Sequence, residues 1–144
     1  GKKPVSFTEA VAVNGTPCLV HDRWGIPETI FRGTLDNVTE EGMRRFNRRM
    51  CGKRDILQAY EQIPPRLLAD IREELEYLYA EIKKASPASA LFNGWTQALI
   101  SSDDRIFPTE NLRAFWQGRC PITEIEAPHY PFYLWKQWNE IWKQ

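Results

Sequence analysis

The sequence is poor in the residues that build metal sites and disulfide frameworks. Its 144 residues include two histidines and three cysteines, Cys18, Cys51 and Cys120. The cysteines are odd in number and widely spaced, with no C-x-x-C pair, which argues against disulfides and against structural zinc. We therefore expect no metal, no cofactor, and reduced thiols that pack as small apolar side chains.

An excess of charge, long apolar runs and glycine-rich loops are also lacking. The 19 basic and 19 acidic side chains cancel, so we expect neither nucleic acid nor a membrane as a partner. No apolar run has the length of a membrane span, and the first residues, GKKPVSF, lack the apolar segment of a signal peptide, which favours a cytoplasmic protein. Without a glycine-rich phosphate loop, a nucleotide site is not indicated.

The residues that are present are typical of a globular domain, because 42% are apolar and 26% are charged. Their patterns divide the chain into three blocks, residues 1–19, 20–89 and 90–144. In the first block, the apolar run Ala10–Val13 ends at Asn14 and predicts a buried strand. The second block has helical patterns, at residues 26–35, 39–52, 53–63 and 65–84. The third block has patterns of strand, helix, strand and helix, at residues 92–102, 108–118, 121–127 and 131–144.

Alternation of strand and helix is typical of parallel βα units, so the sequence predicts an α/β fold. The helical block between strands of one sheet would then be a cap inserted into an α/β core. In such folds, functional groups collect at the carboxyl ends of the strands, where the following loops form a crevice. We therefore expect the site at the edge of the sheet that the cap covers.

Two polar side chains follow successive predicted strands at that edge. Asp104 comes after the strand through Leu99 and Ile100, and His129 comes after the strand at 121–127. A carboxylate beside an imidazole fixes its tautomer and stabilises the imidazolium formed when histidine takes a proton. The order Asp then His fits the last two members of a Ser, Asp, His triad. In a plainer interpretation, Asp104 caps the next helix or closes a turn, and His129 is a loop histidine.

These residues lie in segments that also carry a family resemblance. The segments are AVNGT at 12–16, GIPETIF at 25–31, RRMCG at 48–52, SSDDRIFP at 101–108, and EAPHYPF at 126–132 followed by LWKQW. Over nearly its whole length the chain resembles the pimeloyl-ACP methyl ester esterases of the BioG type, α/β-hydrolases of biotin synthesis. The resemblance implies the C-terminal portion of an α/β-hydrolase parallel sheet with an inserted helical cap, and a carboxylic ester hydrolase. It places the acid on Asp104, with Asp103 less favoured by register, and the base on His129.

The nucleophile that this family implies has no counterpart in the sequence. It is a serine in a strand-turn-helix elbow with small flanking residues. The chain's serines, which do not lie in such a motif, are Ser6, Ser86, Ser89, Ser101 and Ser102. The resemblance therefore implies that the serine belongs to an N-terminal part of the same enzyme. We expect this chain alone to be inactive, because the serine and the oxyanion hole would both be missing.

A basic face is predicted on the helix at 39–52. Arg44, Arg45, Arg48 and Arg49 follow the spacing i, i+1, i+4 and i+5. Acyl carrier proteins are acidic, so the resemblance implies that this face docks the carrier that bears the pimeloyl methyl ester. Alternatively, the arginines are solvated, pair with the glutamates within residues 70–81, or point inward to order the cap.

Two alternative functions remain open, and three tryptophans and the second histidine have structural interpretations. The same Asp and His would serve another carboxylesterase or a thioesterase, and a non-catalytic protein would use the basic and aromatic helices to bind an acidic partner. Trp135, Trp138 and Trp142 have the spacing of a helix face packed on the sheet. His21 and Asp22 follow the first strand, where a turn is favoured over a place in the site.

Overall fold

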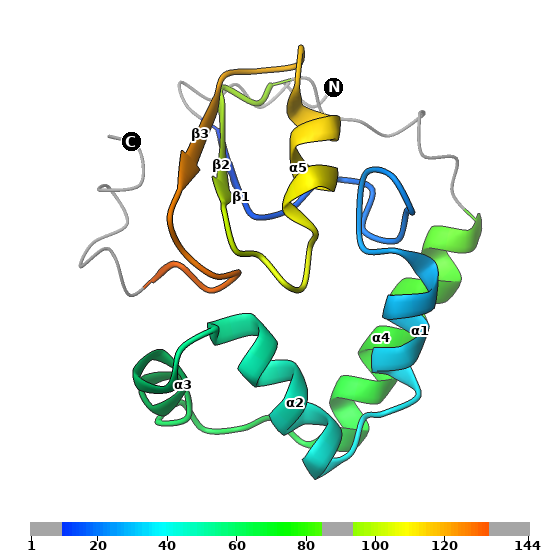
Figure 1. Cartoon of the computed structure of the whole chain (residues 1–144). Coiled ribbons are helices and arrows are strands. Elements are labelled where there is room, and N and C mark those ends of the chain that lie inside the picture. The colour runs from blue at the N-terminus through cyan, green and yellow to red at the C-terminus, as the bar shows by residue number, and fades with distance from the viewer. Residues whose placement is uncertain (1–9, 85–93, 133–144) are drawn as a thin grey trace, which may run out of the picture.

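The computed structural model describes residues 10–84 and 94–132, and a parallel sheet of three strands lies at its centre (Figure 1). The strands are β1 (Val11–Val13), β2 (Gln97–Ser101) and β3 (Ile122–Ile125), in the order β1-β2-β3. The register pairs Ala98 of β2 with Ala12 on one side and with Ile122 on the other. Parallel strands joined through helices confirm the predicted α/β class.

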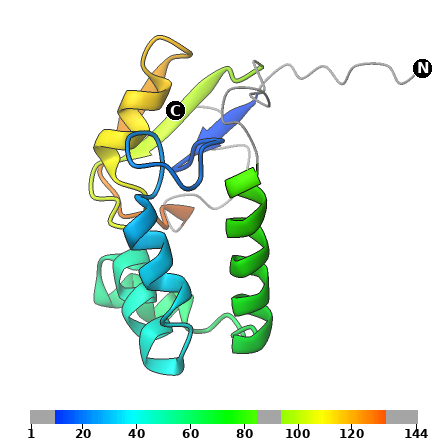
Figure 2. The same cartoon turned by 90° about the vertical axis from the view of Figure 1, so that its right-hand side faces the viewer.

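The helical block lies between β1 and β2 in the chain and beyond the carboxyl ends of the strands in space (Figure 1, Figure 2). Its helices are α1 (Glu28–Leu35), α2 (Glu40–Cys51), α3 (Arg54–Tyr60) and α4 (Leu68–Lys84). Each of the four helical patterns of the sequence is thereby confirmed. No helix within residues 10–84 and 94–132 combines the length and the apolar character that a bilayer crossing needs.

Helix α5 (Thr109–Trp116) connects β2 to β3 and covers one face of the sheet (Figure 1). Its side chains Leu112, Phe115 and Trp116 form a buried core with Ala98 and Ile100 of β2. This confirms the predicted strand, helix and strand of the third block, and it brings the carboxyl ends of β2 and β3 side by side. The closing helix predicted at 131–144 falls almost entirely on residues 133–144, which lie outside the described residues. Trp135, Trp138 and Trp142 are among them.

The carboxyl end of α2 rests against the segment that carries His129. The helix ends at Gly52, whose φ of 75° lies in the left-handed region that glycine enters readily. A Cβ on Gly52 would lie 3.0 Å from the Cβ of Pro128. The backbone N–H of Tyr130 donates to the carbonyl oxygen of Met50 at 2.9 Å. The helical block therefore contacts the chain on both sides of His129.

Helix α4 is attached to α1 by one aromatic contact and two polar ones. The rings of Phe31 and Tyr79 are stacked with their centroids 6.0 Å apart. The Tyr79 hydroxyl donates to Glu28 at 2.6 Å, and Nζ of Lys83 lies 2.5 Å from the same carboxylate. Although every residue of α4 is described, none is buried. The apolar side chains of this helix therefore border a pocket and not a closed core.

All three cysteines are free thiols, as expected from their spacing. Cys18 and Cys51 are buried and Cys120 is half-buried. Burial raises the pKa of each thiol above its usual value. These side chains therefore pack as small apolar groups. Within the described parts of the chain, no group of three or more His, Cys, Asp or Glu is placed to hold a metal ion.

Candidate active site

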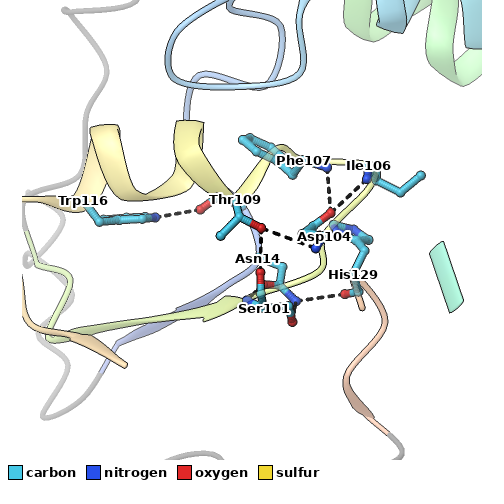
Figure 3. A network of polar contacts seen from close by, with 9 residues as sticks. Asn14, Ser101, Asp104, Ile106, Phe107, Thr109, Trp116 and His129 are labelled. Atoms are coloured by element: carbon cyan, nitrogen blue, oxygen red, sulfur yellow. Dashed lines mark hydrogen bonds and ion pairs between the residues drawn. The ribbon is translucent and has the colours of Figure 1, made fainter. Parts of the chain in front are cut away.

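Asp104 and His129 meet at the carboxyl edge of the sheet (Figure 3). Asp104 follows β2 and His129 follows β3, and the pairing of these strands runs to Ser101 and Ile125. Just beyond, the N–H of Ser102 donates to the carbonyl of Ile125 at 2.8 Å, so the two loops leave the sheet together. Nδ1 of His129 lies 2.7 Å from Oδ2 of Asp104. The structure thus brings the predicted acid and base into contact, while their catalytic roles stay a prediction.

The Asp104 carboxylate is held from two directions. Its side chain is fully buried, with 0% exposed. Oδ1 accepts hydrogen bonds from the backbone N–H groups of Ile106 at 2.9 Å and Phe107 at 2.8 Å. Asp104 therefore closes a turn, but it does not cap α5, whose N-cap is Pro108 without a side-chain hydrogen bond. The turn fixes the carboxylate so that Oδ2 faces the imidazole.

The His129 ring is held at one nitrogen, and its side chain is 25% exposed. Because a carboxylate accepts hydrogen bonds, the contact with Asp104 assigns the hydrogen to Nδ1. In the neutral ring, Nε2 is then the proton acceptor. A ring oriented in this way can act as a general base towards a hydroxyl group within hydrogen-bond reach of Nε2.

The other histidine belongs to a turn. Nδ1 of His21 accepts hydrogen bonds from the backbone N–H groups of Arg23 and Trp24, each at 3.1 Å. Oδ1 of Asp22 accepts from the N–H of Glu28 at 3.1 Å, at the start of α1. The turn role that the sequence favoured for His21 and Asp22 is therefore confirmed.

Two buried polar residues next to the site were not predicted from the sequence. Asn14 is 4% exposed and Ser101 is 0% exposed. Nδ2 of Asn14 donates to Oγ of Ser101 at 2.7 Å and to the carbonyl oxygen of His129 at 2.9 Å, and Oδ1 accepts from the N–H of Ser101 at 2.7 Å. The sequence signal at Asn14 was that of a turn after a strand, which its φ of 51° bears out. Nothing local in the sequence indicated its partners.

The first two arginines of α2 pair with glutamates of the same helix, and Arg48 borders the same hollow as these pairs. Arg44 lies 3.9 Å from Glu40, and Arg45 lies 3.1 Å from Glu41, each one turn along the same helix. Exposed pairs of this spacing contribute about 0.3–0.5 kcal/mol. The partners of these two arginines are thus glutamates of α2 and not the glutamates at 70–81.

Arg48 and Arg49 instead line a basic pocket of about 510 Å³ beside the site. Its lining residues are Arg48, Arg49, Gly52, Lys53, Arg54, Leu57 and Arg105. Arg105 directly follows Asp104, and Gly52 approaches Pro128, so the pocket adjoins the loops of both the acid and the base. Five cationic side chains without an acidic neighbour in the lining suit an anionic ligand group.

A second pocket, of about 280 Å³, is apolar and lies between the helical block and the loop that follows β2. Its apolar lining from α1, α2 and α4 is Ile30, Phe31, Met43, Phe46, Ile71, Leu75 and Leu78. Arg49, Arg105 and Ile106 also line it. Ile106 supplies one of the two N–H groups that bind Asp104. The apolar pocket therefore extends to the turn that fixes the acid.

The chain is similar to proteins of two bacteria. A protein of Haemophilus influenzae described as uncharacterized is 37% identical over 138 residues, which cover 96% of this chain and 63% of that protein. A Bacteroides fragilis protein named malonyl-[acyl-carrier protein] O-methyltransferase is 36% identical over 124 residues, 85% of this chain and 25% of that protein. The chain thus spans less than two thirds of the H. influenzae relative.

A solved structure and a family model agree with these similarities. The crystal structure of selenomethionine BioG from H. influenzae matches with a TM-score of 0.89 and 38% identity, over 96% of this chain and 64% of that one. The model of the family described as pimeloyl-ACP methyl esterase BioG matches residues 3–141. The match spans nearly the whole chain, which therefore belongs to the BioG family.

Proposed function

We propose that this chain supplies the acid and the base of an esterase that hydrolyses the methyl ester of pimeloyl-ACP in biotin synthesis. The observation that carries the proposal is the contact between Asp104 and His129 at the carboxyl ends of adjacent parallel strands. Family membership supports the substrate. The three-stranded sheet and its helical block would be the C-terminal portion of an α/β-hydrolase with an inserted cap.

The proposed reaction follows the acyl-enzyme route of serine esterases. Nε2 of His129 takes the proton of a serine hydroxyl, and the serine oxygen attacks the ester carbonyl. His129 then gives this proton to the departing methoxide, so that methanol leaves and an acyl-serine ester remains. His129 next takes a proton from water, and the resulting hydroxide attacks the acyl carbonyl. The bond to the serine oxygen then breaks, His129 returns the proton to that oxygen, and the acid is released. Asp104 orients the ring and stabilises the imidazolium in both halves of the cycle.

The serine of this route would come from an N-terminal part of the enzyme that precedes this chain. Ser101 lies near the site but is unsuited, because its hydroxyl is fully buried and accepts a hydrogen bond from Asn14. Ser102 follows the end of β2, but α5 begins only at Thr109, whereas an elbow serine stands in a sharp turn at the start of its helix. The complete enzyme, meaning this chain with its N-terminal part, is therefore the form to assay.

The basic and apolar pockets suit the two ends of such a substrate. The prosthetic group of a carrier protein bears a phosphate, and the carrier itself is acidic, so both favour the basic pocket of Arg48, Arg49 and Arg105. The methylene chain of the pimeloyl group favours the apolar pocket, whose lining includes Ile106 of the turn that binds Asp104. The relative named as acting on malonyl-[acyl-carrier protein] also supports a substrate attached to a carrier.

A substitution at the base tests the proposal in the complete enzyme. His129→Ala is expected to lower kcat for hydrolysis of pimeloyl-ACP methyl ester by about 10⁴-fold, measured by mass spectrometry of the carrier-bound product. His21→Ala is the matched control, since His21 belongs to a turn remote in role from the reaction. Full activity of the His129→Ala enzyme, or no hydrolysis by the unmodified complete enzyme, would refute the proposal.

A further inference from the structure

We propose that Asn14 is a positioning residue for the base: its side-chain amide holds the main chain at His129 against the end of β2. The imidazole is thereby kept within reach of Asp104. The consequence for catalysis rests on the proposed function, whereas the positioning itself is a property of this chain.

The amide of Asn14 uses both of its ends. Nδ2 donates to the carbonyl oxygen of His129 at 2.9 Å and to Oγ of Ser101 at 2.7 Å. Oδ1 accepts from the N–H of Ser101 at 2.7 Å. Only an amide offers two donors and an acceptor in this arrangement. Because Asn14 is 4% exposed, water does not replace these bonds readily.

Asn14 joins three segments that are distant in the chain (Figure 3). Its N–H donates to the carbonyl of Leu99 at 3.0 Å and so continues the pairing of β1 with β2. Its φ of 51° then turns the chain out of the strand, a conformation that asparagine adopts more readily than most residues. The side chain meanwhile reaches Ser101 and the His129 segment. The end of β1 therefore sets where the base stands relative to the end of β2, which precedes the acid.

The peptide unit that joins His129 to Tyr130 is held at both of its polar groups. Tyr130 is bonded through its N–H to Met50, and Pro128 approaches Gly52, both of which belong to the end of α2. These contacts hold the loop against the carboxyl end of α2. The bond from Asn14 acts on the carbonyl of His129 itself. Loss of this bond leaves that peptide unit held only through the N–H of Tyr130, so that it can tilt about this remaining contact and carry the ring away from Oδ2 of Asp104.

Three substitutions separate positioning from general folding. Asn14→Asp keeps the size of the side chain but replaces the donor Nδ2 by an oxygen that faces the His129 carbonyl. Asn14→Gly removes the amide while tolerating the positive φ. Ser101→Ala is the matched control, because it removes the bond to Oγ and leaves the bonds from Nδ2 to His129 and from the Ser101 N–H to Oδ1.

The readout is the tautomer of each imidazole, measured by NMR on this chain labelled with ¹⁵N-histidine. The chain has two histidines, and His21, whose Nδ1 accepts two backbone hydrogen bonds, reports an intact fold as the Nε2–H form. His129 should be the Nδ1–H form in the unmodified chain and in Ser101→Ala. In Asn14→Asp and Asn14→Gly its Nδ1–H fraction should fall by about threefold or more, with His21 unchanged.

The same variants in the complete enzyme give an independent measurement. We expect kcat to fall about tenfold or more in both Asn14 variants, with KM little changed, because ring orientation and not substrate binding is affected. An unchanged His129 tautomer in both Asn14 variants overturns the proposal. A changed tautomer in an enzyme that does not hydrolyse pimeloyl-ACP methyl ester would instead uphold the positioning and refute the proposed function.

Discussion

Nδ1 of His129 lies 2.7 Å from Oδ2 of Asp104, and this contact bridges 25 residues of chain. Its geometry depends on two strands that leave the sheet in register and on a turn that holds the carboxylate. Parallel strands with an intervening helix place their carboxyl ends on one edge, so residues that are distant in the chain can meet there. The consequences of the contact can be tested one substitution at a time.

Replacing Asp104 by asparagine should prevent His129 from acting as a base, although the imidazole is still present. In Asp104→Asn, an amide NH₂ would face Nδ1 of His129, so the ring would adopt the Nε2–H tautomer, which cannot accept a proton at Nε2. We expect kcat of the complete enzyme to fall by about 10⁴-fold. Asp103→Asn is the control, because Asp103 is exposed and pairs with Arg105 at 3.5 Å. A loss of less than about tenfold in Asp104→Asn would contradict the triad role.

Charge reversal on α2 should separate its two arginine pairs. The double variant Arg48→Glu and Arg49→Glu should lower kcat/KM for the carrier-bound substrate by about tenfold or more at low salt, since it inverts the charge of the basic pocket. The matched variant Arg44→Glu and Arg45→Glu makes the same change of charge at residues already paired with glutamates, and its effect should be smaller. Equal losses of kcat/KM in the two variants would mean that the overall positive charge of α2 attracts the carrier and that the basic pocket makes no specific contribution. The loss should shrink as salt is added.

A methyl group at Gly52 should lower both the stability of the chain and the activity that depends on His129. Gly52→Ala forces alanine into a φ of 75° and places its Cβ 3.0 Å from Pro128. Gly118→Ala carries a similar φ of 81° with no atom within 4 Å of the new Cβ. Each should lower the free energy of unfolding by about 1–2 kcal/mol, measured by urea denaturation. Gly52→Ala alone should also lower kcat, and a normal kcat in that variant would mean that α2 and the His129 loop are independent.

The attachment of α4 to α1 should weaken in acid. The hydrogen bond from Lys83, followed by that from Tyr79, lowers the pKa of Glu28. A carboxyl whose pKa is depressed by folding contributes stability that is present above its unfolded pKa and lost as the pH falls through its folded pKa. The difference in urea midpoint between the unmodified chain and Glu28→Gln should therefore be largest at neutral pH and should vanish in strong acid. Tyr79→Phe, which keeps the Lys83 bond, should lie between them at neutral pH, and a difference that grows in acid would exclude this account.

The pattern of apolar residues predicted the helices and strands of the described chain because each element has its own period. The contact of Asp104 with His129 could be predicted as well, since both residues follow strands of successive βα units and the family resemblance places the acid and the base on them. The bonds of Asn14 could not, because they depend on the register between β1 and β2 across 87 residues. The basic pocket also needed the tertiary structure. The four arginines of α2 share one helical pattern, and only the folded chain brings Arg105 beside Arg48 and Arg49.

The hydrogen bond from the N–H of Tyr130 to Met50 links helix α2 to the loop that carries His129. Helix α2 borders both the basic and the apolar pocket. Under the proposed function, a substrate in either pocket would contact this helix. The same helix holds the chain one residue after the base. Because the N–H of Tyr130 is bonded to Met50, a displacement of α2 is expected to move the chain next to His129 as well. The shape of both pockets and the contact between His129 and Asp104 would then depend on the position of one helix.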